Sequence, residues 1–212
     1  QDERTVLALA GFARGTPVTE ALLLDYQERL QKAGLFDSVT VTLDPDPAHA
    51  GAATVHVKLH EQTIQVYTFG LGVSANTGPR ASVEHAYRRV FGQPVSSSNK
   101  LEYGRVRQAW TGEVSTHPGD GFSRWLLGGA IERLLTTDDT VLSQRLRLGQ
   151  LHESRRLERL MFAEAERGAR STKTVRRDVF AISANYHVTL RRLDSAVLPT
   201  DGYTLSLQTG LG

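Results

Sequence analysis

The sequence predicts a small α+β segment, with the order helix-helix-strand-strand, followed by antiparallel strands of a membrane β-barrel. Apolar residues in the first part recur at helical spacing and then alternate in two short runs. From about residue 63 the apolar period is two almost throughout. These later runs reach about ten residues, the length of a transmembrane strand and longer than most globular strands. We therefore expect one segment over residues 1–62 and barrel strands over 63–212.

The composition excludes several classes of protein. Of the 212 residues 40% are hydrophobic and 23% are charged, which argues against a disordered chain. No apolar run approaches the roughly 20 residues that a membrane-spanning helix needs. The absence of cysteine excludes disulfides and thiolate metal sites within these residues. A formal net charge of +2 gives no reason to expect a nucleic-acid partner.

Two helices are predicted in the first segment, a short one over Thr5–Phe12 and a longer one that begins after Thr19. Thr19 is a suitable N-cap, and Gly34 is well placed to end the second helix. Apolar residues between them follow a spacing of three and four, at Leu22, Leu23, Tyr26, Leu30 and Ala33.

Two strands are expected next, separated by the turn-rich stretch Asp44–Gly51. They carry alternating apolar residues at Val39, Val41 and Leu43, and then at Val55, Val57 and Leu59. Such strands can form a hairpin whose apolar face packs on the helices.

About eight strands are expected after Thr63, separated by turns at Thr77–Pro79, Asp138–Asp139 and Pro199–Gly202. The clearest alternating rows are Tyr67–Val73, Trp125–Ile131, Leu142–Leu148, Phe180–Leu190 and Tyr203–Leu211. A soluble sandwich would also alternate, but with shorter runs and an outer face rich in Lys, Glu and Thr. The length of the runs favours the membrane barrel.

Charged residues on neighbouring strands suggest ion pairs on the polar face of the sheet. Arg145 and Arg147 share one strand face, and Glu164 and Glu166 share a face of the next strand. Such residues form a lumenal ladder that keeps charges away from lipid. The alternative is an acid–base couple of two carboxylates. We favour the ladder.

Other signals of catalysis or cofactor binding are weak, so we expect no enzyme and no cofactor. Gly70-x-Gly72-x-x-Ala75 matches a dinucleotide fingerprint, but Asn76–Arg80 breaks the helix that such a site requires. His56 and His60 lack the further ligands of a zinc site nearby in sequence. Ser143, Ser183 and His187 are available for hydrolysis, yet no G-x-S-x-G motif occurs.

Aromatic residues in the alternating part have two interpretations. Tyr103, Trp110, Trp125, Tyr186 and Tyr203 could form girdles at the membrane interface. In a soluble sheet the same residues would form its core.

Two sequence motifs resemble the Omp85 superfamily. The pattern of Leu30, Gly34, Phe36, Val39 and Val41 resembles the end of a POTRA domain, L-x-x-x-G-x-F-x-x-V-x-V. The stretch Gly70–Arg80, GLGVSANTGPR, resembles the first barrel strand of the TamA branch, G-x-G-Y-S-T-D-x-G-P-R. Val73 stands where that branch has an aromatic residue, and Asn76 where it has an acid. Leu198–Tyr203 resembles a turn that opens another barrel strand.

This resemblance implies a factor that assembles or translocates outer-membrane proteins without catalysis. It implies a sixteen-stranded barrel in the bacterial outer membrane, in contact with its lipid, and a periplasmic N-terminal part. We expect further POTRA residues before Gln1 and further strands, with a lumenal Arg-Gly-Phe type loop, after Gly212. The implied partners are unfolded outer-membrane proteins and an inner-membrane-anchored protein of the TamB type. A two-partner secretion transporter of the same superfamily and a passive porin are the alternatives.

Two surfaces are predicted to act on clients. The first is a POTRA edge, formed by the hairpin that contains Phe36, Val39, Val41, Val55 and Val57, where an extended segment could pair with the backbone. The second is a lateral seam at the first barrel strand, where glycines weaken the strand interior. The seam residues are Tyr67, Phe69, Gly70, Leu71, Gly72 and Val73.

Overall fold

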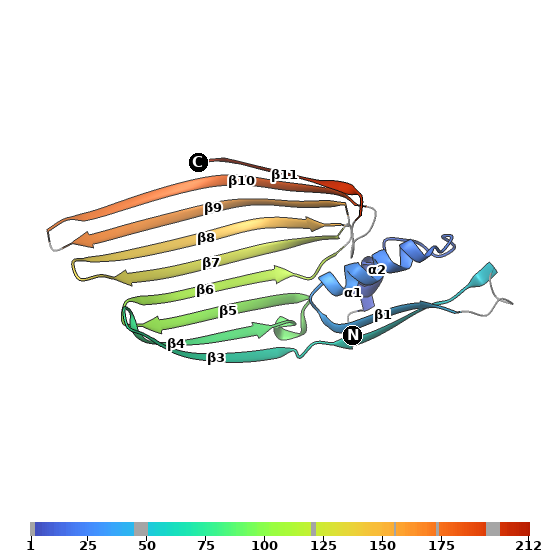
Figure 1. Cartoon of the computed structure of the whole chain (residues 1–212), viewed down its shortest axis with the longest axis horizontal. Coiled ribbons are helices and arrows are strands. Elements are labelled where there is room, and N and C mark those ends of the chain that lie inside the picture. The colour runs from blue at the N-terminus through green and yellow to red at the C-terminus, as the bar shows by residue number, and fades with distance from the viewer. Residues whose placement is uncertain (1–2, 45–50, 120–121, 155, 173, 194–199) are drawn as a thin grey trace.

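The computed structural model describes residues 3–44, 51–119, 122–154, 156–172, 174–193 and 200–212. Two helices and a two-stranded hairpin form an α+β unit, and nine further strands form one sheet beside it (Figure 1). The helices and hairpin strands are α1 (Glu3–Ala8), α2 (Glu20–Lys32), β1 (Phe36–Leu43) and β2 (Val55–Glu61). No helix in the described ranges is long and apolar enough to cross a membrane.

Both ends of α2 follow the prediction. The Thr19 side chain caps the helix by accepting a hydrogen bond from the backbone N–H of Leu22 at 3.2 Å. Gly34 adopts a φ of +69°, the left-handed conformation that ends many helices. The prediction for the first helix is wrong in its bounds, because α1 ends at Ala8. Gly11, with a φ of +69°, already belongs to the loop that turns the chain toward α2.

The core of the α+β unit lies between its helices and its hairpin. Leu30 is fully buried, and Leu9, Tyr26, Phe36 and Val39 are each less than a tenth exposed. The two strands pair in antiparallel register, with Val39 opposite Leu59 and Val41 opposite Val57. The register shifts between Phe36 and Ser38, as at a β-bulge. The predicted order and the packing of the hairpin on the helices are therefore confirmed, while most of the intervening turn, residues 45–50, lies outside the described residues.

The remaining strands form an antiparallel meander in which each strand pairs with its neighbours in sequence. They are β3 (Gln65–Ser74), β4 (Gly78–Tyr87), β5 (Val95–Gly104), β6 (Arg107–Thr116), β7 (Ser123–Leu135), β8 (Asp139–Glu153), β9 (Leu157–Thr172), β10 (Arg176–Leu193) and β11 (Gly202–Leu211). A short 3₁₀ helix, η2 (Val90–Gly92), lies between β4 and β5. In the described residues β3 and β11 are the two edges of this sheet.

The expected count of about eight strands is corrected to nine. The underestimate has a physical reason in residues 78–116, where three strands alternate weakly. Their apolar-facing positions include His85, Asn99 and Gly112, whose side chains do not give a clear hydrophobic period. The turns predicted at Thr77–Pro79 and Asp138–Asp139 lie slightly earlier, at residues 75–77 and 136–138, because Gly78 and Asp139 already begin β4 and β8. Of Pro199–Gly202 the structure describes residues 200–202.

One face of the nine-stranded sheet, here called the apolar face, exposes large hydrophobic side chains on almost every strand. Its most exposed members are Tyr67, Phe69, Leu71, Val73, Leu101, Tyr103, Trp125, Leu146, Leu148, Phe180, Ile182, Tyr203, Leu205, Leu207 and Leu211. The opposite face, here called the polar face, carries Lys100, Arg145, Arg147, Glu84 and Glu164. So much apolar surface on the described part of the chain is far more than an isolated soluble domain shows.

Figure 1 shows the helices at one end of the sheet, close to where β3 begins and β4 and β8 end. We call this the proximal end. The opposite, distal end carries the turns β3–β4, β7–β8 and β9–β10 (Figure 1). Strands β8, β9 and β10 have 15, 16 and 18 residues, so they are longer than the ten-residue strands β3 to β6.

Candidate functional site

Strand β3 contains all six predicted seam residues and is an edge of the sheet. It pairs with β4 on one side only within the described residues. Tyr67, Phe69, Leu71 and Val73 lie on the apolar face, and Leu71 is 91% exposed. An exposed edge strand presents unpaired N–H and C=O groups that another extended segment can bind.

Gly70 and Gly72 face the polar side of β3, opposite Ser82 and Arg80 of β4. A Cβ atom at Gly70 would lie 2.5 Å from Ser82 Oγ, and one at Gly72 would lie 3.1 Å from Arg80 Nε. The glycines thus give space to the side chains of the neighbouring strand. At these two positions β3 contributes no side chain to packing on that face, which weakens its pairing.

The four charged residues predicted on β8 and β9 lie directly opposite one another, Arg145 across from Glu166 and Arg147 across from Glu164. The Arg147 guanidinium donates to Glu164 Oε2 from Nη2 at 2.7 Å and from Nε at 2.9 Å. Arg145 lies 3.8 Å from Glu164 and 3.5 Å from Glu166. Glu164 is the least exposed of the four at 16%, so it is the centre of this charge cluster.

The charged ladder extends beyond the predicted residues. Lys100 binds Glu84 at 2.6 Å across β5 and β4, and Arg107 binds Glu102 at 3.0 Å and Glu132 at 2.6 Å. Sequence reasoning missed these pairs because their strands alternate weakly, so the cross-strand register could not be assigned. All of them satisfy charge locally and hold neighbouring strands together.

The polar face also carries two ring side chains, Phe162 and His187. The Arg147 guanidinium also lies 4.4 Å from the centre of the Phe162 ring, which in turn contacts His187. Guanidinium groups bind favourably over ring faces. Arg147 is therefore fixed from two sides, by a carboxylate and by a ring.

The residues of the predicted POTRA edge are divided between core and hairpin surface. Phe36 and Val39 are buried against the helices, whereas Val55 and Val57 are partly exposed. The backbone N–H of Val41 donates to Gln27 Oε1 of α2 at 3.2 Å. A side chain thus already occupies one donor that an added strand would need.

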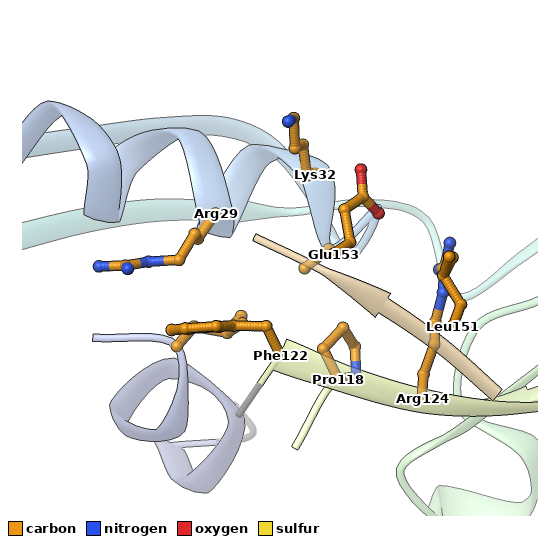
Figure 2. Close-up of a pocket in the computed structure, with 9 residues that line it drawn as sticks. Arg29, Lys32, Pro118, Phe122, Arg124, Leu151 and Glu153 are labelled. Carbon is orange, nitrogen blue, oxygen red and sulfur yellow. The ribbon is translucent and has the colours of Figure 1, made fainter. Parts of the chain in front are cut away.

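A contact between α2 and the sheet, which the sequence did not suggest, joins the two parts at the proximal end. Figure 2 shows Arg29 lying along Phe122, which precedes β7, in a small pocket that also includes Lys32, Arg124 and Glu153. Arg29 lies 4.7 Å from the centre of the Phe122 ring, donates to the carbonyl of Ala10 at 2.6 Å and pairs with Asp25 at 2.8 Å.

Burial perturbs two groups in this part of the α+β unit. Burial lowers the pKa of Arg29, and Asp25 partly offsets the effect. Burial raises the pKa of Tyr26 above its ordinary value of 10.0, with a smaller opposing effect of Arg29. The Tyr26 hydroxyl donates to the carbonyl of Val6 at 3.0 Å, so its neutral form fixes α1 on α2.

The structure gives the surroundings of several residues considered for hydrolysis or metal binding. Within the described residues no three His, Asp or Glu side chains lie close enough to hold a metal ion. Ser183 accepts a hydrogen bond from Asn185 at 3.1 Å, and His187 contacts Phe162. A different pair, Ser123 and His152, lies at 3.1 Å across β7 and β8. A serine nucleophile also needs a group that orients the histidine.

Comparison with known proteins gives the fold. No protein-family model matches the chain. No curated protein matches it either. Among solved structures the chain is similar to BamA from Haemophilus ducreyi lacking POTRA domains 1–3, with a TM-score of 0.59 and 10% identity.

That similarity covers 98% of this chain but 45% of the BamA chain, so the chain spans less than half the length of its match. At 10% identity the match shows the fold alone. The described part of the chain therefore shares the fold of the matched part of that structure, and its nine strands form an open sheet.

Proposed function

We propose that this chain is part of an outer-membrane protein assembly or translocation factor, and that it acts through the free edge of β3 without catalysis. The apolar face of the sheet contacts lipid, and the polar face lines the lumen, which explains why the two faces differ so sharply. The Omp85-like fold supports this placement. The α+β unit would lie in the periplasm.

The observation that carries the proposal is the edge strand β3. Its backbone is free on one side within the described residues, and its polar face has two glycines where packing is weakest. A client strand that pairs with β3 gains backbone hydrogen bonds whatever its sequence. The free energy of the step comes from the client's own strand pairing and burial in lipid, so no nucleotide is needed.

The α+β unit is the proposed docking segment, a POTRA-like unit at the proximal end. It would bind extended clients, or an inner-membrane-anchored partner of the TamB type, by backbone pairing at the hairpin. Because Gln27 covers the N–H of Val41, pairing along β1 requires this side chain to move away. We propose that the functions specific to a factor of the TamA type belong to this unit and to the β3 seam.

Site-specific photocrosslinking in cells tests the function. A photoreactive phenylalanine analogue at Leu71 of β3 should form adducts with newly made outer-membrane proteins. The same analogue at Leu148, in the middle of the sheet and 53% exposed on the same face, is the matched control and should form few. Equal adduct formation at both positions, or none at Leu71, would contradict the proposal.

A second experiment separates the proposal from its rivals. In a two-partner secretion transporter the adducts at Leu71 would come from one dedicated substrate, whereas an assembly factor crosslinks several barrel proteins. A passive porin would give no protein adducts, and its loss would change solute uptake only. Loss of a TamB-type partner should reduce the adducts of an assembly factor of the TamA branch.

A further inference from the structure

A row of aromatic rings lies on the apolar face at the proximal end, next to the edge strand. Tyr67 and His85 stack with their ring centres 4.3 Å apart across β3 and β4. His85 lies 6.0 Å from Tyr87, and Tyr87 lies 6.5 Å from Phe91. We call Tyr67, His85, Tyr87 and Phe91 the aromatic row.

Phe91 is at the end of this row and is held in an exposed, unfavourable conformation. Its side chain is 88% exposed, and its φ of 50° is the left-handed region that phenylalanine rarely adopts. Its backbone N–H donates to the Tyr87 hydroxyl at 3.1 Å, which fixes the tip of the turn. Gly92 continues the left-handed turn with a φ of +77°. An outlier of this kind suggests a function for the exposed ring.

Two arginines precede this ring, Arg88 and Arg89, and both line a small pocket at the base of the turn together with Glu61, Gln62 and His117. Among the ion pairs of the described ranges none includes Arg88 or Arg89. Arg88 is held at the base of the turn, since its Nη1 donates to the carbonyl of Thr63 at 2.7 Å. Its carbonyl oxygen is also bound to His117 Nε2 at 2.7 Å.

We propose that the aromatic row, together with Arg88 and Arg89, is a phospholipid-binding anchor at the proximal rim of the barrel. This inference rests on the proposed function, since it assumes that the apolar face lies in lipid. Aromatic rings favour the depth of the headgroups, and arginine binds phosphate. The row is continuous with the exposed apolar residues of β3, and the two arginines, which form no ion pair in the described ranges, complement an anionic headgroup such as that of phosphatidylglycerol.

The anchor would fix the depth of the β3–β4 hairpin in the membrane. Backbone pairing with a client requires that β3 keep its position while its edge is free. Tyr67 belongs to β3, and Phe91 belongs to the turn after β4. Lipid contact at both residues would therefore hold the two strands of the hairpin at the same depth in the membrane.

Spin labels test the inference in the full-length protein, reconstituted into vesicles of phosphatidylcholine with phosphatidylglycerol. The 212 residues contain no cysteine of their own. In a background without other cysteines, single labels are placed by Phe91→Cys, Leu101→Cys in β5 and Val175→Cys in the distal β9–β10 turn. We expect the label at position 91 to collide more often with lipid-soluble oxygen than with a water-soluble nickel complex. It should lie shallower than position 101, while position 175 should favour nickel.

Three results would overturn the inference in distinguishable ways. A label at position 91 that favours nickel, while position 101 favours oxygen, refutes the anchor and leaves the barrel proposal intact. A label at 91 that is immobile and shielded from both reagents indicates a protein partner instead of lipid. If position 101 also favours nickel, the apolar face is not in lipid and the proposed function itself fails.

The charge requirement has its own measurement. The fraction of spin-labelled phosphatidylglycerol that the protein immobilises should fall in Arg89→Gln toward that of phosphatidylcholine. Lys58→Gln, which removes a cation of β2 in the α+β unit, is the matched control and should leave the preference unchanged. An unchanged preference in Arg89→Gln would refute a role of this cation in headgroup binding.

Discussion

Replacement of Glu164 by glutamine should destabilise the sheet through one identified charge cluster. Glu164 Oε2 accepts two hydrogen bonds from Arg147, at 2.7 and 2.9 Å, and Arg145 lies 3.8 Å from the same carboxylate. Its side chain is 16% exposed, whereas the two arginines are 42% and 47% exposed. Solvent therefore screens the charges of the arginines. We expect the free energy of unfolding to fall by about 1–2 kcal/mol, between the effects of breaking a surface ion pair and a buried one.

The assay is the free energy of unfolding of the full-length protein in a fixed lipid or detergent, from urea titration followed by tryptophan fluorescence. Glu113→Gln is the matched control, because Glu113 is an exposed carboxylate on the same polar face and forms no described ion pair. We expect this control to change stability by less than about 0.5 kcal/mol. A double-mutant cycle with Arg147→Met should then recover a coupling of about 1 kcal/mol.

Equal effects of the two glutamine variants, or a coupling energy near zero, would refute the reasoning.

The same variants also address catalysis. If Glu164 acted as a general acid or base, Glu164→Gln would abolish turnover far beyond what its loss of stability explains. The ladder interpretation requires that client assembly fall only in proportion to the loss of stability.

Three further predictions concern the α+β unit and the sheet. Leu30→Ala should lower the free energy of unfolding by about 2–5 kcal/mol because Leu30 is fully buried, while Leu24→Ala, at a position 57% exposed, should lower it by less than about 0.5 kcal/mol. Hydrogen exchange of the β1 and β2 amides in the intact protein measures both effects. Equal exchange in the two variants would contradict the prediction. Because burial raises the pKa of Tyr26, its contribution is complete below pH 10.0 and is lost as pH rises above that value; a comparison of unfolding midpoints should show that Tyr26→Phe removes this step. Gly149→Ala should lower the free energy of unfolding by about 1–3 kcal/mol, because its Cβ would lie 2.7 Å from the carbonyl oxygen of Met161. A Cβ at Gly168 would meet no atom within 4 Å, so Gly168→Ala should leave stability unchanged in the same urea titration.

Local patterns predicted the elements that have strong local signals. Thr19 and Gly34 mark the ends of α2 because capping and left-handed turns depend on the chemistry of single residues. The long strand β10 was visible because its apolar residues alternate without interruption from Phe180 to Leu190, and β11 because Tyr203, Leu205 and Leu207 alternate. The pairing of Arg147 with Glu164 followed from two adjacent strands joined by a short turn, in which register is nearly determined.

The strands β4, β5 and β6 had no comparable signal, and the predicted number of strands was therefore too low. Their apolar-facing positions alternate between hydrophobic and polar side chains, so only pairing with neighbours identifies the strands. The same lack of register hid the pairs of Lys100 with Glu84 and of Arg107 with Glu132.

The sequence by itself determined the two-part organisation, the α2 helix, the hairpin and the two-sided character of the sheet, because these follow from periodicity along one stretch of chain. Only the tertiary structure decided which backbone groups remain free and which residues far apart in sequence meet. Gln27 covers the N–H of Val41, and Arg29 lies on Phe122, although 14 residues separate the first pair and more than ninety the second. Such contacts depend on how whole elements pack together, and no local pattern of residues encodes that packing.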